Sequence, residues 1–182
     1  MTSTRAVARG LVNFALAEVG WFAAVAGAAA GRPWLGPLVA IVVVAVHLAV
    51  SRGRKGEWLL LMASGLVGLI LDGLLKETGV VAYAADVVPA SWLAPVWIVA
   101  LWLLFATMLN ESLAWLQGRP FLAAGLGAVF GPLSYLAGAR LEAAWFPRST
   151  AVAMVALAVI WAVALPFLLW LAGRVRLRHD RS

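Results

Sequence analysis

The stretch TAVAMVALAVIWAVALPFLLWLAG, residues 150–173, contains no acidic, basic or amide side chain. A helix needs about 20 apolar residues to cross the hydrocarbon core of a bilayer, because it rises 1.5 Å per residue. This stretch meets that length, and a soluble helix of the same size would carry a polar face. Residues 150–173 are therefore predicted to span a membrane.

Five further apolar stretches precede it and are separated by short segments rich in Gly, Pro and Arg. The connection 77–91 is the only one of appreciable length, and no internal repeat or separate soluble domain is evident. The sequence predicts an all-α polytopic membrane protein, a bundle of six transmembrane helices in a single domain over residues 1–182. The predicted spans are residues 11–30, 35–51, 57–76, 92–117, 121–141 and 150–173.

The overall composition leads to the same class. Hydrophobic residues make up 64% of the chain and charged residues 12%, with a mean hydropathy of +0.97. A soluble domain typically carries about 25% charged residues, so lipid has to cover much of this surface. The net charge of +6 comes from short basic clusters between apolar runs, which is typical of membrane loops and argues against nucleic-acid binding.

The distribution of basic residues predicts the orientation. With a cytoplasmic N-terminus, ten of the fourteen Lys and Arg residues fall on the cytoplasmic side. The other four, which are Arg32, Lys76, Arg140 and Arg148, fall outside. Cytoplasmic loops are enriched in Lys and Arg, so both termini are predicted to be cytoplasmic and residues 77–91 to lie on the outer side.

Tryptophan is abundant, with ten residues in the chain. Six lie near predicted span ends, where an amphipathic indole prefers the headgroup layer. These expected anchors are Trp34, Trp58, Trp92, Trp115, Trp145 and Trp170.

Polar side chains inside the spans are costly, at roughly 2.5–3.5 kcal/mol for a charge at the bilayer centre. Five of them fall in the predicted cytoplasmic half and are candidates for one ligand-binding cavity: Asn13, Glu18, His47, Asn110 and Glu111. Trp21 and Trp102 are expected to form its apolar walls. Two alternatives remain open: His47 is an ordinary interfacial histidine, and Glu111 reaches the headgroups if the fourth span ends near Leu109.

Two further charged residues lie in the predicted outer half. Asp72 falls on the same helical face as Gly65 and Gly68, a small-residue seam that favours close helix packing, so Asp72 is expected to be buried. Arg140 lies at a similar depth and is a candidate partner in a polar pair with Asp72. Structural pairing between helices is the alternative to a role in substrate binding.

Several kinds of chemistry lack the residues they need. The chain has no cysteine, and His47 is the only histidine in a predicted span. Bis-histidine haem and metal-dependent hydrolysis are therefore not expected, and neither a metal nor a cofactor is predicted. Paired aspartates and a phosphate-binding glycine loop are also absent from the sequence.

Three stretches carry a resemblance. They are Asn13-Phe14 followed by Gly20-Trp21, PVWIVALWLLFATMLNESLAWL from Pro95 to Leu116, and GPLSYLAGARL from Gly131 to Leu141. With these, the chain is similar over nearly its whole length to a family of small bacterial multipass inner-membrane proteins catalogued only as a domain of unknown function. The resemblance implies a bacterial inner-membrane protein. It brings no reaction, ligand or catalytic residue with it.

These features favour binding or transport of a hydrophobic or amphipathic small molecule or lipid, because six helices with converging polar groups can enclose a cavity. A membrane enzyme of lipid or isoprenoid metabolism is an alternative. A third is a structural or accessory subunit of a membrane complex. Under the first reading, the chain is similar in size and span number to the substrate-binding membrane subunit of vitamin-uptake transporters, which docks on a partner through small residues of its first span. Ala24 and Ala28, or Gly27 and Gly31, are the candidates for such a face.

Overall fold

A computed structural model describes residues 2–51, 56–87 and 92–179. The described chain is helical apart from two short strands and its connections. The elements are α1 (Thr2–Ala29), α2 (Leu35–Val50), α3 (Glu57–Glu77), β1 (Ala82–Tyr83), α4 (Val96–Met108), the 3-10 helix η1 (Ala114–Leu116), α5 (Pro120–Arg140), β2 (Ala144–Trp145) and α6 (Thr150–His179).

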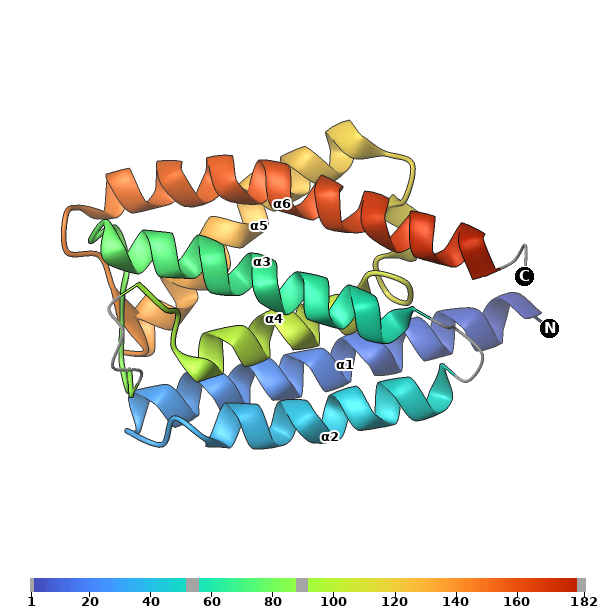
Figure 1. Ribbon diagram of the computed structural model, residues 1–182, viewed down its shortest axis with the longest axis horizontal. Helices are drawn as coiled ribbons and strands as arrows, with labels where there is room; N and C mark the ends of the chain where they lie inside the picture. The colour runs from blue at the N-terminus through green and yellow to red at the C-terminus, as the bar shows by residue number, and fades with distance from the viewer. Residues whose placement is uncertain (1, 52–55, 88–91, 180–182) are drawn as a thin grey trace.

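The six helices run alternately up and down the bundle (Figure 1). Both termini lie at one end, called here the termini end, and the opposite end is called the far end. Helices α1, α3 and α5 run from the termini end to the far end, and α2, α4 and α6 return. Helix α1 packs on α2 and α4, α4 also packs on α3, and α5 packs mainly on α6, which touches α3.

Four helices are long and apolar enough to cross a membrane. They comprise Thr4–Ala29, Glu57–Glu77, Pro120–Arg140 and Thr150–Val175, while α2 and α4 are apolar but shorter. The all-α prediction is confirmed. Helices α2, α3 and α5 agree closely with the predicted spans, whereas α1 begins nine residues before its predicted span and α6 ends six residues after its own. Of the basic residues that set the predicted orientation, Arg52, Arg54, Lys55 and Arg181 lie outside the described residues.

The fourth predicted span, 92–117, is wrong in length. Helix α4 ends at Met108, and the chain continues through turns into η1. The side chains of Asn110 and Ser112 bond to α3 and α1 instead of facing lipid. Because these polar side chains hydrogen-bond to neighbouring helices, the chain is stabilised in an irregular conformation after Met108.

Close contacts between helices depend on small residues. A Cβ at Gly36 of α2 would lie 2.5 Å from the Ala24 Cβ of α1, so these helices touch backbone to backbone. Ala24 and Ala28 are buried, and a Cβ at Gly27 would meet Leu35 at 2.9 Å. Ala24, Gly27 and Ala28 therefore pack inside this chain, whereas Gly31 is exposed and has open space around it.

At the far end, two connections are joined by a two-stranded antiparallel sheet. Strand β1, from the α3–α4 connection, pairs with β2, from the α5–α6 connection, with Tyr83 opposite Ala144. Lys76 supports the same connection, because its ammonium pairs with Asp86 and also donates to the Leu93 carbonyl. This pairing fixes Tyr83 over the far end of the helices.

Candidate functional site

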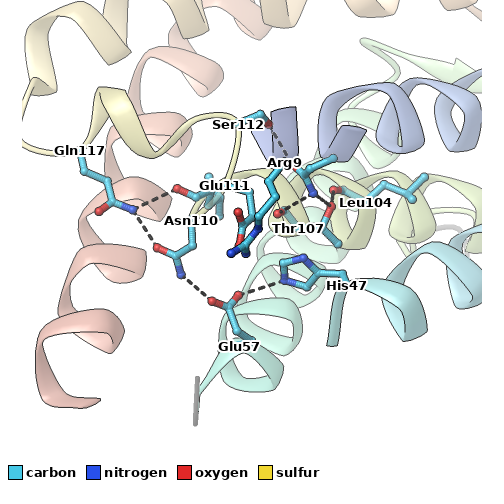
Figure 2. Close-up of polar contacts among 11 residues, drawn as sticks. Arg9, His47, Glu57, Leu104, Thr107, Asn110, Glu111, Ser112 and Gln117 are labelled. Carbon is cyan, nitrogen blue, oxygen red and sulfur yellow. Dashed lines mark hydrogen bonds and ion pairs between the residues drawn. The ribbon is translucent and has the colours of Figure 1, made fainter. Parts of the chain in front are cut away.

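A network of buried polar side chains occupies the termini end (Figure 2). Glu57, in the first turn of α3, is at its centre: one carboxylate oxygen lies 3.2 Å from His47 Nε2 and the other accepts from Asn110 Nδ2 at 3.0 Å. Gln117 then donates to Asn110 Oδ1 at 2.8 Å. His47, Glu57 and Asn110 are all buried, so α2, α3 and the segment after α4 are tied together by one chain of hydrogen bonds.

A second set of polar contacts ties α1 to the same segment. Arg9 pairs with Glu111 at 2.8 Å. Asn13 donates to the Thr107 carbonyl at 3.2 Å and accepts from the Ser112 hydroxyl at 2.9 Å. Glu111 lies just after the end of α4 and is therefore paired with a residue of this chain, Arg9.

The structure thus brings four of the five predicted binding residues to one region and leaves Glu18 out. A groove of about 260 Å³ there is lined by Asn13, His47 and Glu111, together with Arg9 and apolar residues of α1 and α2. Glu18 is half-buried, does not line this groove, and makes no hydrogen bond or ion pair with any residue in the described part of the chain. Its position on α1 explains this, because Asn13 and Glu18 are about 140° apart on a helix of 3.6 residues per turn.

The central residue of this network, Glu57, was missed from the sequence. It follows a basic segment at the start of a span, which is typical of an interfacial residue. The available signal was depth in the membrane. His47 lies near the end of one predicted span and Glu57 at the start of the next, so the short connection between them places both at a similar depth. These side chains mostly satisfy one another's hydrogen-bonding groups. A buried network that is satisfied in this way fixes the positions of its members, so it stabilises the arrangement of the elements at the termini end.

A different polar centre lies toward the far end, around Asp72. This carboxylate is completely buried. Its Oδ1 accepts from Tyr83 Oη at 2.6 Å and Tyr135 Oη at 2.5 Å, and its Oδ2 accepts from Trp102 Nε1 at 2.6 Å. Elements α3, α4, α5 and β1 therefore meet at one carboxylate.

The predicted Asp72–Arg140 pair is absent from this structure. Arg140 is exposed at the end of α5 and makes no ion pair within the described ranges. The buried aspartate is satisfied by hydroxyl and indole donors instead. The seam that led to Asp72 does pack inward: a Cβ at Gly68 would meet Trp102 Cγ at 2.1 Å, and one at Gly65 would meet Leu103 at 3.1 Å.

Tyr83 takes part in this centre as a neutral donor. Burial, and then the adjacent Asp72 carboxylate, raise the pKa of the Tyr83 hydroxyl well above its ordinary value. The proton stays on the phenol because an anion there would lose its hydration and face a carboxylate. Tyr83 also lies edge-to-face on Trp97, whose Nε1 donates to the Ala84 carbonyl.

An aromatic cavity of about 120 Å³ lies beside Asp72, between α1 and α4 on one side and α5 and α6 on the other. No charged side chain lines it. Its aromatic wall consists of Trp21, Tyr83, Trp97, Trp102, Phe105, Tyr135 and Trp161. For scale, an apolar cavity of about 150 Å³ accepts a benzene molecule.

The ten tryptophans divide between two locations. The six expected anchors near span ends are each more than half exposed. The remaining four, Trp21, Trp97, Trp102 and Trp161, all line the aromatic cavity. Trp21 and Trp102 were expected to wall a site with Glu18 and Asn110, and they wall this cavity instead.

The polar atoms next to the cavity interact mainly with one another. Trp161 Nε1 has no hydrogen bond of good geometry among the described residues, although the Tyr135 hydroxyl is close to it. This nitrogen is completely buried, so it is not open to the cavity. Ser134 Oγ lines the cavity and accepts from Trp21 Nε1 at 3.1 Å.

Trp161 is fixed by its neighbours. Its ring stacks on Trp102 with centroids 4.8 Å apart and an interplanar angle of 9°, and it meets Phe105 edge-on at 5.2 Å. A Cβ at Gly131 of α5 would approach Trp161 Cγ to 2.2 Å, so the indole fills the space that this glycine leaves. Sequence spacing gave no sign of this, because Trp161 lies on α6 and its partners come from α4 and α5.

In the described ranges, no group of three or more His, Asp or Glu side chains is placed to hold a metal ion. The aromatic lining at the far end is suited to an apolar group.

A family model described as "Protein of unknown function (DUF2878)" matches residues 10–167. The chain belongs to this family. The match includes all seven aromatic residues of the cavity, Asp72, and the hydrogen-bonded residues from Asn13 to Gln117 of the termini end. No curated protein and no solved structure matches the chain.

Proposed function

We propose that this DUF2878 protein is a six-span inner-membrane protein with cytoplasmic termini, which binds a hydrophobic or amphipathic small molecule in the aromatic cavity. The observation that carries the proposal is the cavity itself. The four tryptophans that are not among the exposed anchors converge there, next to the buried polar centre around Asp72. Pockets for small ligands are typically apolar with a few polar groups that fix orientation.

Helix direction supports six crossings. The long helices α1, α3 and α5 all start at the termini end (Figure 1). If each crosses the membrane, the chain has to return through α2 and α4 between them. Helix α2 has 16 residues and α4 has 13, or about 24 and 20 Å at 1.5 Å per residue, and the segment after α4 adds to the second length. The ten-to-four distribution of basic residues supports cytoplasmic termini.

The binding site is proposed at the far end and not at the termini end, because the two linings differ. The cavity at the far end is walled by aromatic rings and no charged side chain lines it. The groove at the termini end is lined by Arg9, His47 and Glu111, which suit an apolar molecule less well. The cavity also lies between two packed groups of helices, α1 with α4 and α5 with α6, which is a common location for small-molecule sites.

The test uses substitutions that fill the cavity. Gly138 lines it, is buried, and has open space where a Cβ would stand. Gly138→Leu is therefore expected to occupy the cavity without displacing a neighbour, and Gly138→Ala to do so partly. Gly125→Leu is the matched control, because Gly125 lies on the same helix, is exposed and also has an open Cβ position.

Wild type and control, purified from membranes in mild detergent, should retain a small molecule that organic extraction and mass spectrometry detect. Gly138→Leu should retain less of it, and Gly138→Ala an intermediate amount. Equal retention by all four proteins would contradict the cavity as the binding site. Reporter fusions after Thr78 and at the C-terminus test the topology, and a periplasmic C-terminus would contradict it.

A further inference from the structure

We infer that the groove at the termini end, between α1 and α2, holds a phospholipid whose headgroup carries both a phosphate and a primary ammonium, that is, a phosphoethanolamine lipid. The inference rests on the proposed crossing of the membrane by α1 and α2, and it does not depend on the aromatic cavity. The observation that carries it is the distribution of charged and apolar side chains along this groove, which has a volume of about 260 Å³.

The groove lies along the outside of the bundle. Helices α1 and α2 touch at Ala24 and Gly36 toward the far end, and the groove lies between their other ends (Figure 1). Three valines of its lining are exposed, Val12 on α1 and Val46 and Val50 on α2. These side chains offer an apolar surface to a lipid chain that lies between the two helices.

The charged and apolar parts of the groove lie at different depths. Arg9 lies two residues before the first predicted span, and Ser51 is the last residue of the second, so both fall at the predicted level of the headgroups, where basic residues of membrane proteins gather. Leu16 and Val43 line the other end of the groove and lie about 10–12 Å further along the helices at 1.5 Å per residue. A phospholipid has the same profile, with a charged headgroup above apolar chains.

Two opposite charges lie side by side at the headgroup level. Arg9 Nη2 donates to Glu111 Oε1 at 2.8 Å, and both residues line the groove (Figure 2). The Arg9 side chain is 50% exposed, and its guanidinium carries five N–H donors, so it can bind Glu111 and a phosphate oxygen together. The Glu111 carboxylate can accept several hydrogen bonds, so an ammonium beside it would be bound as well.

Two further polar side chains of the lining are held by the network of the protein itself. Asn13 bonds to the Thr107 carbonyl and to the Ser112 hydroxyl, and His47 Nε2 lies 3.2 Å from Glu57. These contacts fix the inner wall of the groove. Arg9 and Glu111 are therefore the side chains that we assign to the headgroup.

The two charges select the class of headgroup. A headgroup with a phosphate as its only charge would pair with Arg9 but would be repelled by Glu111. A choline headgroup has three methyl groups on its nitrogen and has no N–H to donate to the carboxylate. A phosphoethanolamine headgroup supplies a phosphate for Arg9 and an ammonium with three N–H donors for Glu111, so it complements both charges.

The test is a competition among three phospholipids that have identical acyl chains and carry phosphoethanolamine, phosphocholine or phosphoglycerol headgroups. Full-length protein is inserted into nanodiscs that contain the three lipids in equal amounts, and the lipids that stay bound are counted by native mass spectrometry. Because the chains are identical, contacts with the valines cancel and the ratios report on the headgroup. Arg5→Gln is the matched control, because Arg5 is exposed on the same helix and does not line the groove.

Wild type should retain the phosphoethanolamine lipid in preference to both others. Glu111→Gln should lower the ratio of phosphoethanolamine to phosphocholine lipid about fivefold, and Arg9→Gln should lower retention of all three lipids about fivefold, because all three carry the phosphate. Fivefold corresponds to about 1 kcal/mol, which is typical of one charged contact at a membrane surface. Arg5→Gln should behave as wild type.

A second pair of variants tests the apolar part of the groove without touching either charge. Val12→Trp should fill the groove from its exposed side and reduce retention of all three lipids. Its control is Val7→Trp, because Val7 is as exposed as Val12, at 59%, and does not line the groove. This pair keeps the inference open to refutation if Arg9→Gln or Glu111→Gln does not fold.

Several results would overturn the inference. Equal retention of phosphoethanolamine and phosphocholine lipids by wild type would refute the ammonium contact, and a preference for the phosphoglycerol lipid would identify an anion site instead. Equal retention by Val12→Trp and Val7→Trp would show that lipid surrounds the protein without occupying the groove.

These outcomes differ from failure of the proposed function. Gly138→Leu, which fills the aromatic cavity, should retain the same phospholipids as wild type, so the groove is judged separately from the cavity. A wild-type protein that does not insert into nanodiscs would contradict the membrane crossing on which both proposals rest.

Discussion

Replacement of Gly68 by alanine should disturb the aromatic centre more than its single methyl group suggests. Gly68 lies on α3 directly under the Trp102 indole, and an added Cβ would stand 2.1 Å from Trp102 Cγ and Cδ1 and 2.5 Å from Nε1. Carbon atoms in contact are about 3.5 Å apart or more. The indole, which is a rigid ring and is itself buried, therefore has to retreat by about 1.4 Å.

That displacement has two energetic consequences. Overpacking of a filled core costs about 1–3 kcal/mol. The bond from Trp102 Nε1 to Asp72 Oδ2, now 2.6 Å, would break if the ring moved away along it, and loss of a hydrogen bond to a carboxylate costs about 1.5–3 kcal/mol. Gly→Ala returns about 1 kcal/mol of helix propensity. The expected loss of unfolding free energy is about 3 kcal/mol.

The assay is unfolding in mixed micelles as a function of the denaturing detergent fraction, with near-ultraviolet circular dichroism as the probe. The same substitution at Gly125, where nothing lies within 4 Å of the added Cβ, is the control and should change stability by less than about 1 kcal/mol. Gly68→Ala should also reduce the aromatic circular dichroism, because Trp102 stacks on Trp161. A Gly68→Ala protein as stable as Gly125→Ala would refute the packing described for this seam.

Other expected outcomes concern the two polar centres. Asp72→Leu leaves three donors without an acceptor and should destabilise the protein by at least about 3 kcal/mol. The control is Glu77→Leu, at an exposed position on the same helix, which should change stability by less than about 0.5 kcal/mol. Comparable melting temperatures for the two variants would contradict the role of Asp72. Glu57→Ala should cost about 2–5 kcal/mol, because it removes the acceptor of the Asn110 amide and the carboxylate beside His47. Glu57→Gln should cost clearly less, because its amide oxygen can still accept from Asn110, and the reverse order would show that the network is not held by hydrogen bonds. Arg140→Gln should leave the melting temperature unchanged, because Arg140 is exposed and has no ion pair within the described ranges, and a loss of several degrees would restore a structural role for it.

The helical class and most helix boundaries could be predicted because lipid imposes a simple rule. Apolar stretches of sufficient length form helices, and Gly, Pro and Arg clusters separate them. The rule failed after Met108, where the helix ends although the predicted apolar span continues to residue 117. Asn110 and Ser112 have partners on α3 and α1, and composition along one segment carries no information about those partners.

The polar centres could be predicted only in part. Burial of Asp72 followed from the spacing of Gly65 and Gly68, since spacing on one helix is readable from sequence. Its partners were not readable, because Tyr83, Trp102 and Tyr135 come from three other segments and a lone arginine at similar depth is a simpler choice. The same limit explains Glu18: depth placed it beside His47, but the direction of a side chain around α1 depends on how α1 packs.

The central claim, that the aromatic cavity holds an apolar ligand, is tested most directly by photolabelling. A dodecylbenzene analogue with a diazirine on the ring, activated by light in nanodiscs, marks the residues that surround the bound ring. Label is expected at Val25, Leu101 and Trp161, which line the cavity, and it should fall in Gly138→Leu but not in Gly125→Leu. Label confined to exposed apolar residues on the outside of the bundle, such as Phe22 and Val129, and unchanged by Gly138→Leu, would contradict the claim.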